Sequence, residues 1–413
     1  MKIKSWLVPA TALLAGALAS PSFAQVVKIA HIDPYSGPIA NLNANGVATM
    51  KYSLDLASKN AWAGPGITFE LVSFDGKGSA QDSLLQFKAA TDQGIRYIYQ
   101  SLSSSIGLAL IDAVNRYNER NPGKEVLFFS PTDQASEMTN EKCSFWFFRF
   151  DLNVEMRSEA MAAFLAKDQS IKKIYMINMN YSTGQQISRD VRAALKRKRP
   201  DVEIVGDDLH AMLQVKDFTP YVAKMRASGA DAIVTGNWSS DLTLLLKAMK
   251  EAGLKTPMYT YNAQTTGIPT ALAAAGSDNV KVLNYWLANQ NPKTHAALSD
   301  PFKAKYDDDF TQIPWYNSVR MLTQAMKTAK STEPVAVARA MEGLKITSLN
   351  GEIEMRKQDH QLLQQLVIGE WTKVNGKDVV FDLEKTGWGF KPIDRLEPYV
   401  SAMPTSCQMK RPA

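Results

Sequence analysis

The stretch IRYIYQSLSSSIG, residues 95–107, is the unit on which the fold of this chain is built. An apolar strand at 95–100 runs into a serine-rich run at 101–105, and a helical pattern follows from Leu108. A strand that restarts at once as a helix directs backbone N–H groups and hydroxyls at one point. That point suits a carboxylate or another anion, because the first N–H groups of a helix carry partial positive charge. The alternative interpretation is a serine that only caps the helix.

The same alternation extends on both sides of this stretch. Residue 150 separates two βα halves of similar size. Helices of about ten to fifteen residues between strands are typical of a parallel sheet with crossover connections, and hence of an α/β fold. Apolar strands are predicted at 26–32, 68–74, 95–100 and 126–129 in the first half, and at 173–178, 202–205, 232–235 and 258–261 in the second.

The chain after residue 280 fits neither half cleanly. A strand is predicted at 280–287, and helices at 301–310 and 315–328. Residues 352–355 and 366–372 look like an antiparallel pair, and VNGK at 374–377 is a turn signal. We therefore expect the chain to cross between its domains more than once.

The first 24 residues have the pattern of a secretory signal. Lys2 and Lys4 precede an apolar run at 6–18, and SFA at 22–24 predicts cleavage after Ala24. An uncleaved membrane anchor is disfavoured, because the run is short and Pro9 interrupts it. We therefore expect a mature protein outside the cytoplasm, without membrane insertion.

Composition and charge narrow the class of protein. The chain has 413 residues, 45% of them hydrophobic and 21% charged, which suggests two globular domains. Cleavage removes two lysines and no acidic residue, so the formal net charge falls from +6 to 6 − 2 = +4. This mildly positive net charge is too small to indicate a nucleic-acid-binding surface. The basic run at 196–199 is interpreted as the solvent-exposed end of a helix. We expect no nucleic-acid partner.

The chain contains only two cysteines, Cys143 and Cys407. Two cysteines of an exported protein often pair, which predicts a disulfide between the C-terminal tail and the segment after the fourth strand. Two buried free thiols are the alternative.

Polar residues gather at the predicted strand ends, where open α/β sheets bind their ligands. Hydroxyls, amides and aromatics with almost no charge suit recognition of a small polar molecule, although each residue alone could cap a loop. These residues are Ser36, Ser103, Ser104, Ser105, Thr132 and Gln134 in the first half, and Tyr181, Thr183, Trp238 and Asn262 in the second.

Enzyme signatures are weak. The four histidines show no metal-ligand spacing, and neither a phosphate-binding loop, a dinucleotide fingerprint nor a G-x-S-x-G elbow occurs. We therefore predict a protein that is not an enzyme and that uses no cofactor or metal. An exported enzyme with an unfamiliar site is the alternative.

At these residues the chain resembles the leucine/isoleucine/valine-binding family of periplasmic receptors, the type I substrate-binding proteins of ABC importers. The resemblance covers nearly the whole mature chain. It implies two doubly wound lobes joined by a three-segment hinge, which close around a ligand and then dock on a membrane permease. The motifs are SGP at 36–38, SSS at 103–105, SPT at 130–132, YSTG at 181–184 and PWYN at 314–317.

The resemblance also implies how the chain divides between the lobes. The first lobe would hold residues 25–150 and 279–343, and the second 151–278 and 344–390. Residues 391–413 would form a C-terminal tail. We expect a monomer in the periplasm.

Site roles follow from the resemblance position by position. The serine that binds the ligand carboxylate falls on Ser104, and two further first-lobe contacts fall near Thr132 and Gln134. The aromatic residue that packs on the ligand falls on Trp238, and another contact falls near Thr183 with Tyr181 close by.

One position departs from the family pattern. The acidic residue that pairs with an amino acid's ammonium falls on Asn262, which is neutral. A buried ammonium without a counter-charge costs several kcal/mol. Asp133 or Asp241 could supply the negative counter-charge in place of the residue at 262.

We therefore predict the solute-binding component of an ABC importer, with a small carboxylate-bearing ligand between the lobes. A branched-chain or related amino acid is the family default. An aromatic or aliphatic acid, or an amide, is the alternative because Asn262 is neutral. A ligand-sensing partner of a signalling protein is a further alternative, since it uses the same fold.

Overall fold

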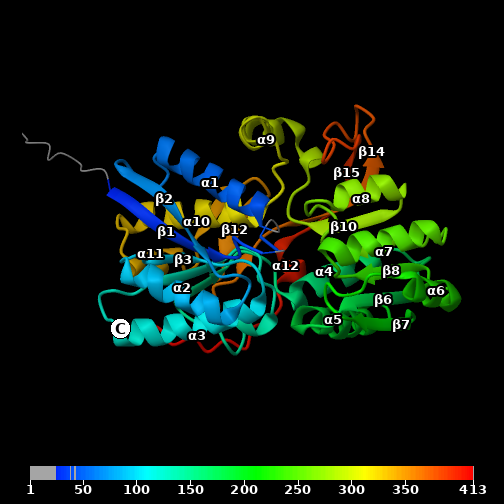
Figure 1. The fold of residues 1–413 in the computed structure, drawn as a ribbon, viewed down its shortest axis with the longest axis horizontal. Coiled ribbons are helices and arrows are strands. Elements are labelled where there is room, and N and C mark those ends of the chain that lie inside the picture. The colour runs from blue at the N-terminus through cyan, green and yellow to red at the C-terminus, as the bar shows by residue number, and fades with distance from the viewer. Residues whose placement is uncertain (1–24, 38, 41–42, 413) are drawn as a thin grey trace, which may run out of the picture.

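The computed structural model describes residues 25–37, 39–40 and 43–412. The predicted signal segment and Pro38 of the SGP motif lie outside the described residues. Figure 1 shows two lobes, each with a central sheet and helices packed against it. Within the described ranges, no helix combines the length and apolar character needed to cross a membrane.

The first lobe contains a five-stranded parallel sheet in the order β2-β1-β3-β4-β5. Strands β3, β4 and β5 are buried along their whole length and therefore appear in the sequence as largely apolar runs, as in LFFS of β4. The strands are β1 Gln25–Asp33, β2 Ile67–Asp75, β3 Tyr97–Tyr99, β4 Leu127–Ser130 and β5 Phe147–Arg149. One face is covered by α1 Ala44–Lys59, α10 Ile313–Ala329 and α11 Pro334–Met341, and the other by α2 Ala80–Asp92 and α3 Ser104–Arg120.

The second lobe contains a seven-stranded sheet in the order β15-β14-β10-β9-β8-β6-β7. Its parallel strands are β6 Lys173–Met179, β7 Glu203–His210, β8 Ala232–Thr235, β9 Met258–Thr260 and β10 Val280–Asn284. The antiparallel strands β14 Leu366–Lys373 and β15 Trp388–Leu396 form one edge. One face is covered by α4 Val154–Leu165 and α5 Ser182–Lys198, and the other by α6 Thr219–Ser228, α7 Ser239–Glu251 and α8 Ile268–Ala275.

The two sheets share one topology. In each, the first strand of the lobe lies between the second and the third, so the parallel strands follow the order 2-1-3-4-5. This order is typical of doubly wound folds. The predicted α/β fold with two doubly wound lobes is therefore confirmed.

The chain crosses between the lobes after β5, between β10 and α10, and between β13 Leu362–Leu363 and β14, and after β15 the C-terminal tail returns to the first lobe. Strand β13 belongs to a small antiparallel sheet with β11 Lys345–Ser348 and β12 Gly351–Met355. Helix α9 Pro292–Tyr306 lies within the second crossing, and Figure 1 shows it above the junction of the lobes. The short helices are η1 Ser136–Thr139, η2 Ala288–Gln290 and α12 Pro398–Ser401.

Three segments lie in a different part of the fold from the one predicted. Strand β10, which we assigned to the first lobe, pairs with β9 and β14 in the second sheet. Residues 345–363, assigned to the second lobe, pack on the first through Ile353, Met355 and Leu362. Residues 391–396, assigned to the tail, continue β15. An apolar strand carries no mark of the sheet it joins, so only the tertiary contacts decide these placements.

Two local predictions are also wrong. Residues 352–355 and 366–372 do not pair, because β12 bonds to β11 and β13 whereas β14 bonds to β10 and β15. The helix predicted at 301–310 begins earlier, at Pro292, where the side chain of Asn291 caps it. It ends at Asp307, whose φ of 51° is left-handed.

Cys143 and Cys407 form a disulfide with a Cα–Cα distance of 5.7 Å, as the sequence predicts. Hydrogen bonds fix the same tail beside η1. Thr405 Oγ1 donates to the carbonyl of Thr139 at 2.7 Å, and the Ser406 N–H donates to Asn140 Oδ1 at 3.1 Å. The C-terminal tail is therefore tied to the first lobe.

Candidate ligand-binding site

Five of the predicted site residues lie where the strand order of each sheet reverses. In the first lobe, Ser103 and Ser104 follow β3, which lies beside β1. In the second lobe, Tyr181 and Thr183 follow β6 and Trp238 follows β8, which are again neighbours. Loops that leave adjacent strands toward opposite faces open a crevice at this point, and open α/β sheets bind ligands there.

Ser104 is held at the start of α3 by its neighbours after β4. Its Oγ accepts hydrogen bonds from the backbone N–H groups of Gln134 at 3.1 Å and Ala135 at 3.2 Å. The hydroxyl hydrogen of Ser104 is thereby left to donate to a ligand oxygen. Ser103 precedes it with a φ of 82° and makes no side-chain capping bond, so the simple serine cap is not observed. Ser105 is exposed.

Asp33, at the end of β1, shapes the loop that presents Ser104. Its carboxylate accepts hydrogen bonds from the Leu102 N–H at 3.1 Å, from Asn43 Nδ2 at 2.9 Å and from the Ser101 hydroxyl. The Thr132 hydroxyl donates to the Ser101 carbonyl. Sequence reasoning did not select Asp33, although an aspartate directly after a buried strand was a usable signal.

The second-lobe residues form an aromatic pair. Trp238 Nε1 donates a hydrogen bond to the Tyr181 hydroxyl at 3.2 Å. Burial raises the pKa of Tyr181, the charge of Asp133 raises it further, and the charge of Arg157 lowers it. Tyr181 therefore lies within electrostatic range of a first-lobe aspartate and of an arginine on α4. Thr183 is buried beside it.

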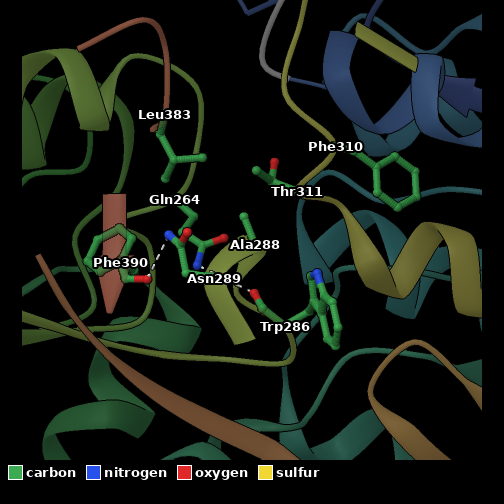
Figure 2. Close-up of a pocket in the computed structure, with 8 residues that line it drawn as sticks. All are labelled: Gln264, Trp286, Ala288, Asn289, Phe310, Thr311, Leu383 and Phe390. Carbon is green, nitrogen blue, oxygen red and sulfur yellow. Dashed lines mark hydrogen bonds between the residues drawn. The ribbon is translucent and has the colours of Figure 1, made fainter. Parts of the chain in front are cut away.

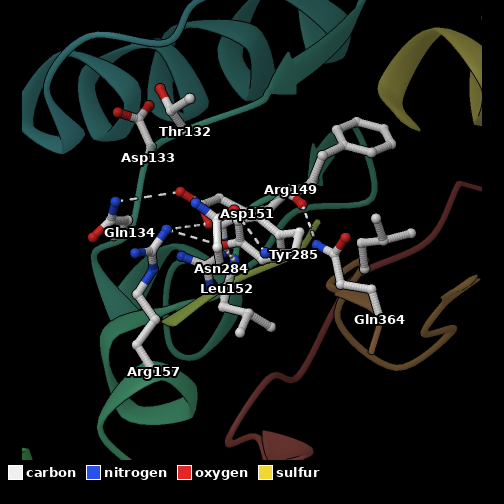
Figure 3. A network of polar contacts seen from close by, with 12 residues as sticks. Thr132, Asp133, Gln134, Arg149, Asp151, Leu152, Arg157, Asn284, Tyr285 and Gln364 are labelled. Atoms are coloured by element: carbon white, nitrogen blue, oxygen red, sulfur yellow. Dashed lines mark hydrogen bonds and ion pairs between the residues drawn. The ribbon is translucent and has the colours of Figure 1, made fainter. Parts of the chain in front are cut away.

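A chain of hydrogen bonds joins Gln134, which follows β4, to α4 (Figure 3). Gln134 Nε2 donates to Asp151 Oδ2 at 3.3 Å, and Arg157 Nη2 donates to Asp151 Oδ1 at 2.6 Å. Arg157 Nη2 also donates to the Tyr285 hydroxyl at 2.8 Å. Asp151, Arg157 and Tyr285 were missed by sequence reasoning. Charged residues six apart at a lobe crossing were the available signal.

The acidic residues that could replace the missing counter-charge are sequestered. Burial raises the pKa of Asp133 to about 8, and its carboxylate packs against Gly107. Asp241 is fully buried, and its Oδ2 accepts a hydrogen bond from the Leu213 N–H at 2.8 Å. Asn262 Nδ2 donates to the carbonyls of Gly236 and Asn237, both at 3.1 Å.

Ser36 is not drawn into this group. It is exposed, and its hydroxyl donates to Asp75 Oδ2 at 2.5 Å at the ends of β1 and β2. A small cavity elsewhere has Phe310 and Thr311 on one side and second-lobe residues on the other (Figure 2). The predicted site residues do not line it. Its second-lobe lining is Gln264, Trp286, Ala288, Asn289, Leu383 and Phe390.

Comparisons with known proteins identify the family. Residues 26–377 match the model of the periplasmic binding protein family. This chain belongs to that family. Within it, the full-length likeness to Leu/Ile/Val-binding proteins places the chain among the type I receptors of the leucine-binding group, which confirms the predicted resemblance.

One curated relative of this periplasmic binding protein is Leu/Ile/Val-binding protein homolog 4 of Brucella melitensis. It is 31% identical over 420 residues, covering 98% of this chain and 97% of the relative. The leucine-, isoleucine-, valine-, threonine-, and alanine-binding protein of Pseudomonas aeruginosa is 22% identical over 362 residues, covering 87% of this chain and 94% of the relative.

Solved structures agree with the fold. A closed leucine-, isoleucine-, valine-, threonine-, and alanine-binding protein from Brucella ovis superposes with a TM-score of 0.84 at 30% identity, covering 94% of this chain and 100% of that one. A solute-binding protein of an ABC transporter from Rhodopseudomonas palustris, in complex with 3,4-dihydroxybenzoic acid, gives 0.75 at 16% identity, covering 90% and 98%. Members of the family are solute-binding proteins of ABC transporters, and its characterised homologues are periplasmic.

Proposed function

We propose that this periplasmic binding protein carries a small monocarboxylic acid without a charged amino group to the permease of an ABC importer. The observation that carries the proposal is the neutral amide of Asn262, whose Nδ2 is already bonded to two backbone carbonyls. An ammonium in this position would lack the carboxylate that repays its desolvation.

The neighbouring carboxylates support the same conclusion. Burial disfavours the charged form of Asp133 and raises its pKa to about 8, so this carboxyl group keeps its proton at neutral pH. Asp241 is buried behind the loop at Leu213. Asp151 is ionically paired with Arg157 at 2.6 Å, so its charge is already compensated. None of these three offers a free counter-charge to an ammonium.

The other parts of the site suit an acid with an apolar body. The Ser104 hydroxyl and the first N–H groups of α3 would bind the carboxylate, since the start of a helix favours an anion. Thr132 and Gln134 would orient it. Trp238 and Tyr181 would cover the apolar part, because their indole and phenol edges are joined by a hydrogen bond and leave the ring faces for packing.

A branched-chain amino acid is the second candidate. The relative that is 31% identical along its length is a Leu/Ile/Val-binding protein homolog by name, which favours this ligand class. The ammonium would then have to be met by neutral oxygens such as Asn262 Oδ1.

A matched pair of ligands separates the two candidates. Isothermal titration calorimetry would compare 4-methylpentanoate with leucine, which differ only in the ammonium, and a thermal-shift series would repeat the comparison with 3-phenylpropanoate and phenylalanine. We expect the acids to bind at least about tenfold more tightly than the amino acids, which corresponds to about 1.4 kcal/mol. Tighter binding of leucine would contradict the proposal and favour the amino acid.

Ser104→Ala tests the carboxylate end of the site. We expect it to weaken binding of the acid by roughly 1–3 kcal/mol, the value of a hydrogen bond to a charged group. Ser170→Ala is the matched control, because Ser170 lies before the N-terminal end of β6, whereas the candidate site follows the C-terminal ends of the strands. An unchanged dissociation constant for Ser104→Ala would rule out the role of this hydroxyl.

A further inference from the structure

We propose that Arg157 binds a second, uncharged oxygen of the ligand, so that the receptor selects hydroxy or oxo carboxylic acids over the corresponding plain acids. The inference rests on the proposed function, because it concerns the same interlobe site.

Arg157 is buried but only partly bonded. Its side chain is 7% exposed. Nη2 makes the bonds to Asp151 and Tyr285, whereas the buried Nε has no hydrogen-bond partner among the described residues. A buried donor of a charged group without a partner is costly, and native proteins almost always satisfy it. We therefore infer that the bound ligand supplies the missing acceptor.

The surroundings of Arg157 hold its guanidinium in place. The rings of Tyr261 and Tyr285 lie with their centroids 5.8 and 5.6 Å from the Arg157 Cζ. Aromatic faces attract a guanidinium and restrict its orientation. The hydroxyl of Tyr261 is also buried without a hydrogen-bond partner in the described part of the chain. The Tyr261 ring therefore lies against the same guanidinium whose Nε is unpaired within the described ranges.

Arg157 is linked to both ends of the proposed site, the carboxylate end at Ser104 and the aromatic end at Tyr181 and Trp238. The bonds through Asp151 and Gln134 connect it to Ser104, which would hold the carboxylate. Its charge also reaches Tyr181, the partner of Trp238. An acceptor on a ligand that lies between Ser104 and the aromatic pair would therefore meet the guanidinium on the hinge side.

The charge balance favours an uncharged acceptor. Asp151 Oδ1 already lies 2.6 Å from Arg157 Nη2, so the pair is neutral. A second carboxylate would meet the negative charge of Asp151 as well as the positive charge of Arg157. A hydroxyl or carbonyl oxygen accepts from Nε–H without that repulsion. An ordered water in the same place is the competing explanation, and it would not make binding depend on the ligand's second oxygen.

The test measures discrimination within sets of acids by isothermal titration calorimetry. The probes are 4-methylpentanoate, its 2-hydroxy and 2-oxo derivatives, and phenylacetate with 4-hydroxyphenylacetate. Each set contains one plain acid and one or two acids with an extra hydroxyl or oxo group. In the unmodified protein we expect the tighter-binding oxygenated acid of each set to bind about tenfold more tightly than the plain acid. Arg157→Lys keeps a positive charge opposite Asp151 but removes the Nε–H and the planar fork. It should reduce this preference to about threefold or less. The readout is the ratio of affinities for oxygenated and plain acids within each variant, so a uniform loss of affinity does not affect it.

A second variant keeps the test decisive if Arg157→Lys does not fold. Tyr261→Phe removes an unpaired buried hydroxyl, so it should fold at least as well as the unmodified protein and still lower the preference. Arg192→Lys is the surface control, since Arg192 pairs with Asp207 at 2.8 Å and is half-exposed. Two results would overturn the role of Arg157, provided that plain acids still bind. One is that the unmodified protein shows no preference for oxygenated acids. The other is that this preference is unchanged in Tyr261→Phe and in folded Arg157→Lys. Failure of every acid to bind would overturn the proposed function itself.

Discussion

At the scale of single residues, Asp133 is a strongly perturbed acid near the candidate site. Its carboxylate is fully buried with both oxygens unpaired among the described residues, and Figure 3 shows it directed away from Gln134 and Arg157. Burial raises its pKa to about 8, whereas an aspartate in the unfolded chain titrates near pH 4. Between these values the folded protein binds more protons than the unfolded chain, so the free energy of unfolding falls as pH rises through this window.

Asp133→Asn should remove that dependence. The amide stays uncharged at every pH, so we expect the variant to gain at least about 1 kcal/mol of stability over the parent at pH 8, and much less at pH 5. Urea denaturation at the two pH values measures the difference. Asp92→Asn, on an exposed turn of α2 beside Lys88, is the control. An equal change at both pH values would show that Asp133 is ionised in the folded state.

At the scale of elements, the start of α5 is set by a close approach of backbone to backbone. Gly184 is the third residue of α5, and a Cβ there would overlap the carbonyl oxygen of Met179 at the end of β6. Only glycine allows the helix to leave the strand so tightly. This turn places Tyr181 and Thr183 at the candidate site, after the end of β6.

Gly184→Ala should therefore displace the first turn of α5. We expect a loss of about 1–3 kcal/mol in the free energy of unfolding, as for other overpacked positions, together with weaker ligand binding. Thermal unfolding and calorimetry measure the two effects. Ala193→Ser, on the exposed face of the same helix, is the matched control. Full stability of Gly184→Ala would mean that β6 and α5 can separate without cost.

At the scale of the whole molecule, Gln186 of α5 makes side-chain hydrogen bonds from the second lobe to the first. The Ser136 N–H donates to Gln186 Oε1 at 3.2 Å, and Gln186 Nε2 donates to Glu137 Oε2 at 2.9 Å. Ser136 and Glu137 belong to η1 of the first lobe, whereas Gln186 belongs to the second. These bonds exist only while the lobes are close, so they favour the closed arrangement.

Gln186→Ala should shift the hinge equilibrium toward open forms. Each lost hydrogen bond is worth roughly 0.5–1.5 kcal/mol, and this cost is added to the binding of every ligand alike. Small-angle X-ray scattering of the unliganded protein should show a larger radius of gyration, and calorimetry should show a uniform loss of affinity. A loss confined to particular ligands would instead place Gln186 in contact with them.

Much of the fold and part of the site could be predicted from sequence alone. The alternation of strands and helices predicted both lobes, since side-chain period and turn residues are local properties. The serine run after β3 predicted Ser104, and the aromatic and polar residues after β6 and β8 predicted Tyr181 and Trp238 by the same rule of strand ends. Asp33 was missed although it ends a buried strand, because its role is to hold a loop nearly 70 residues away, and that contact shows only in the tertiary structure.

The sequence by itself determined the main alternation of strands and helices, the α/β class and the neutral Asn262, and it indicated the pairing of the two cysteines. Only the tertiary structure decided that β10 joins the second sheet, that residues 345–363 pack on the first lobe, and that Arg157 meets Asp151 and Tyr285. The reason is physical. Periodicity records which side of a strand or helix is buried, whereas the partner that buries it is chosen by contacts between residues far apart in the chain.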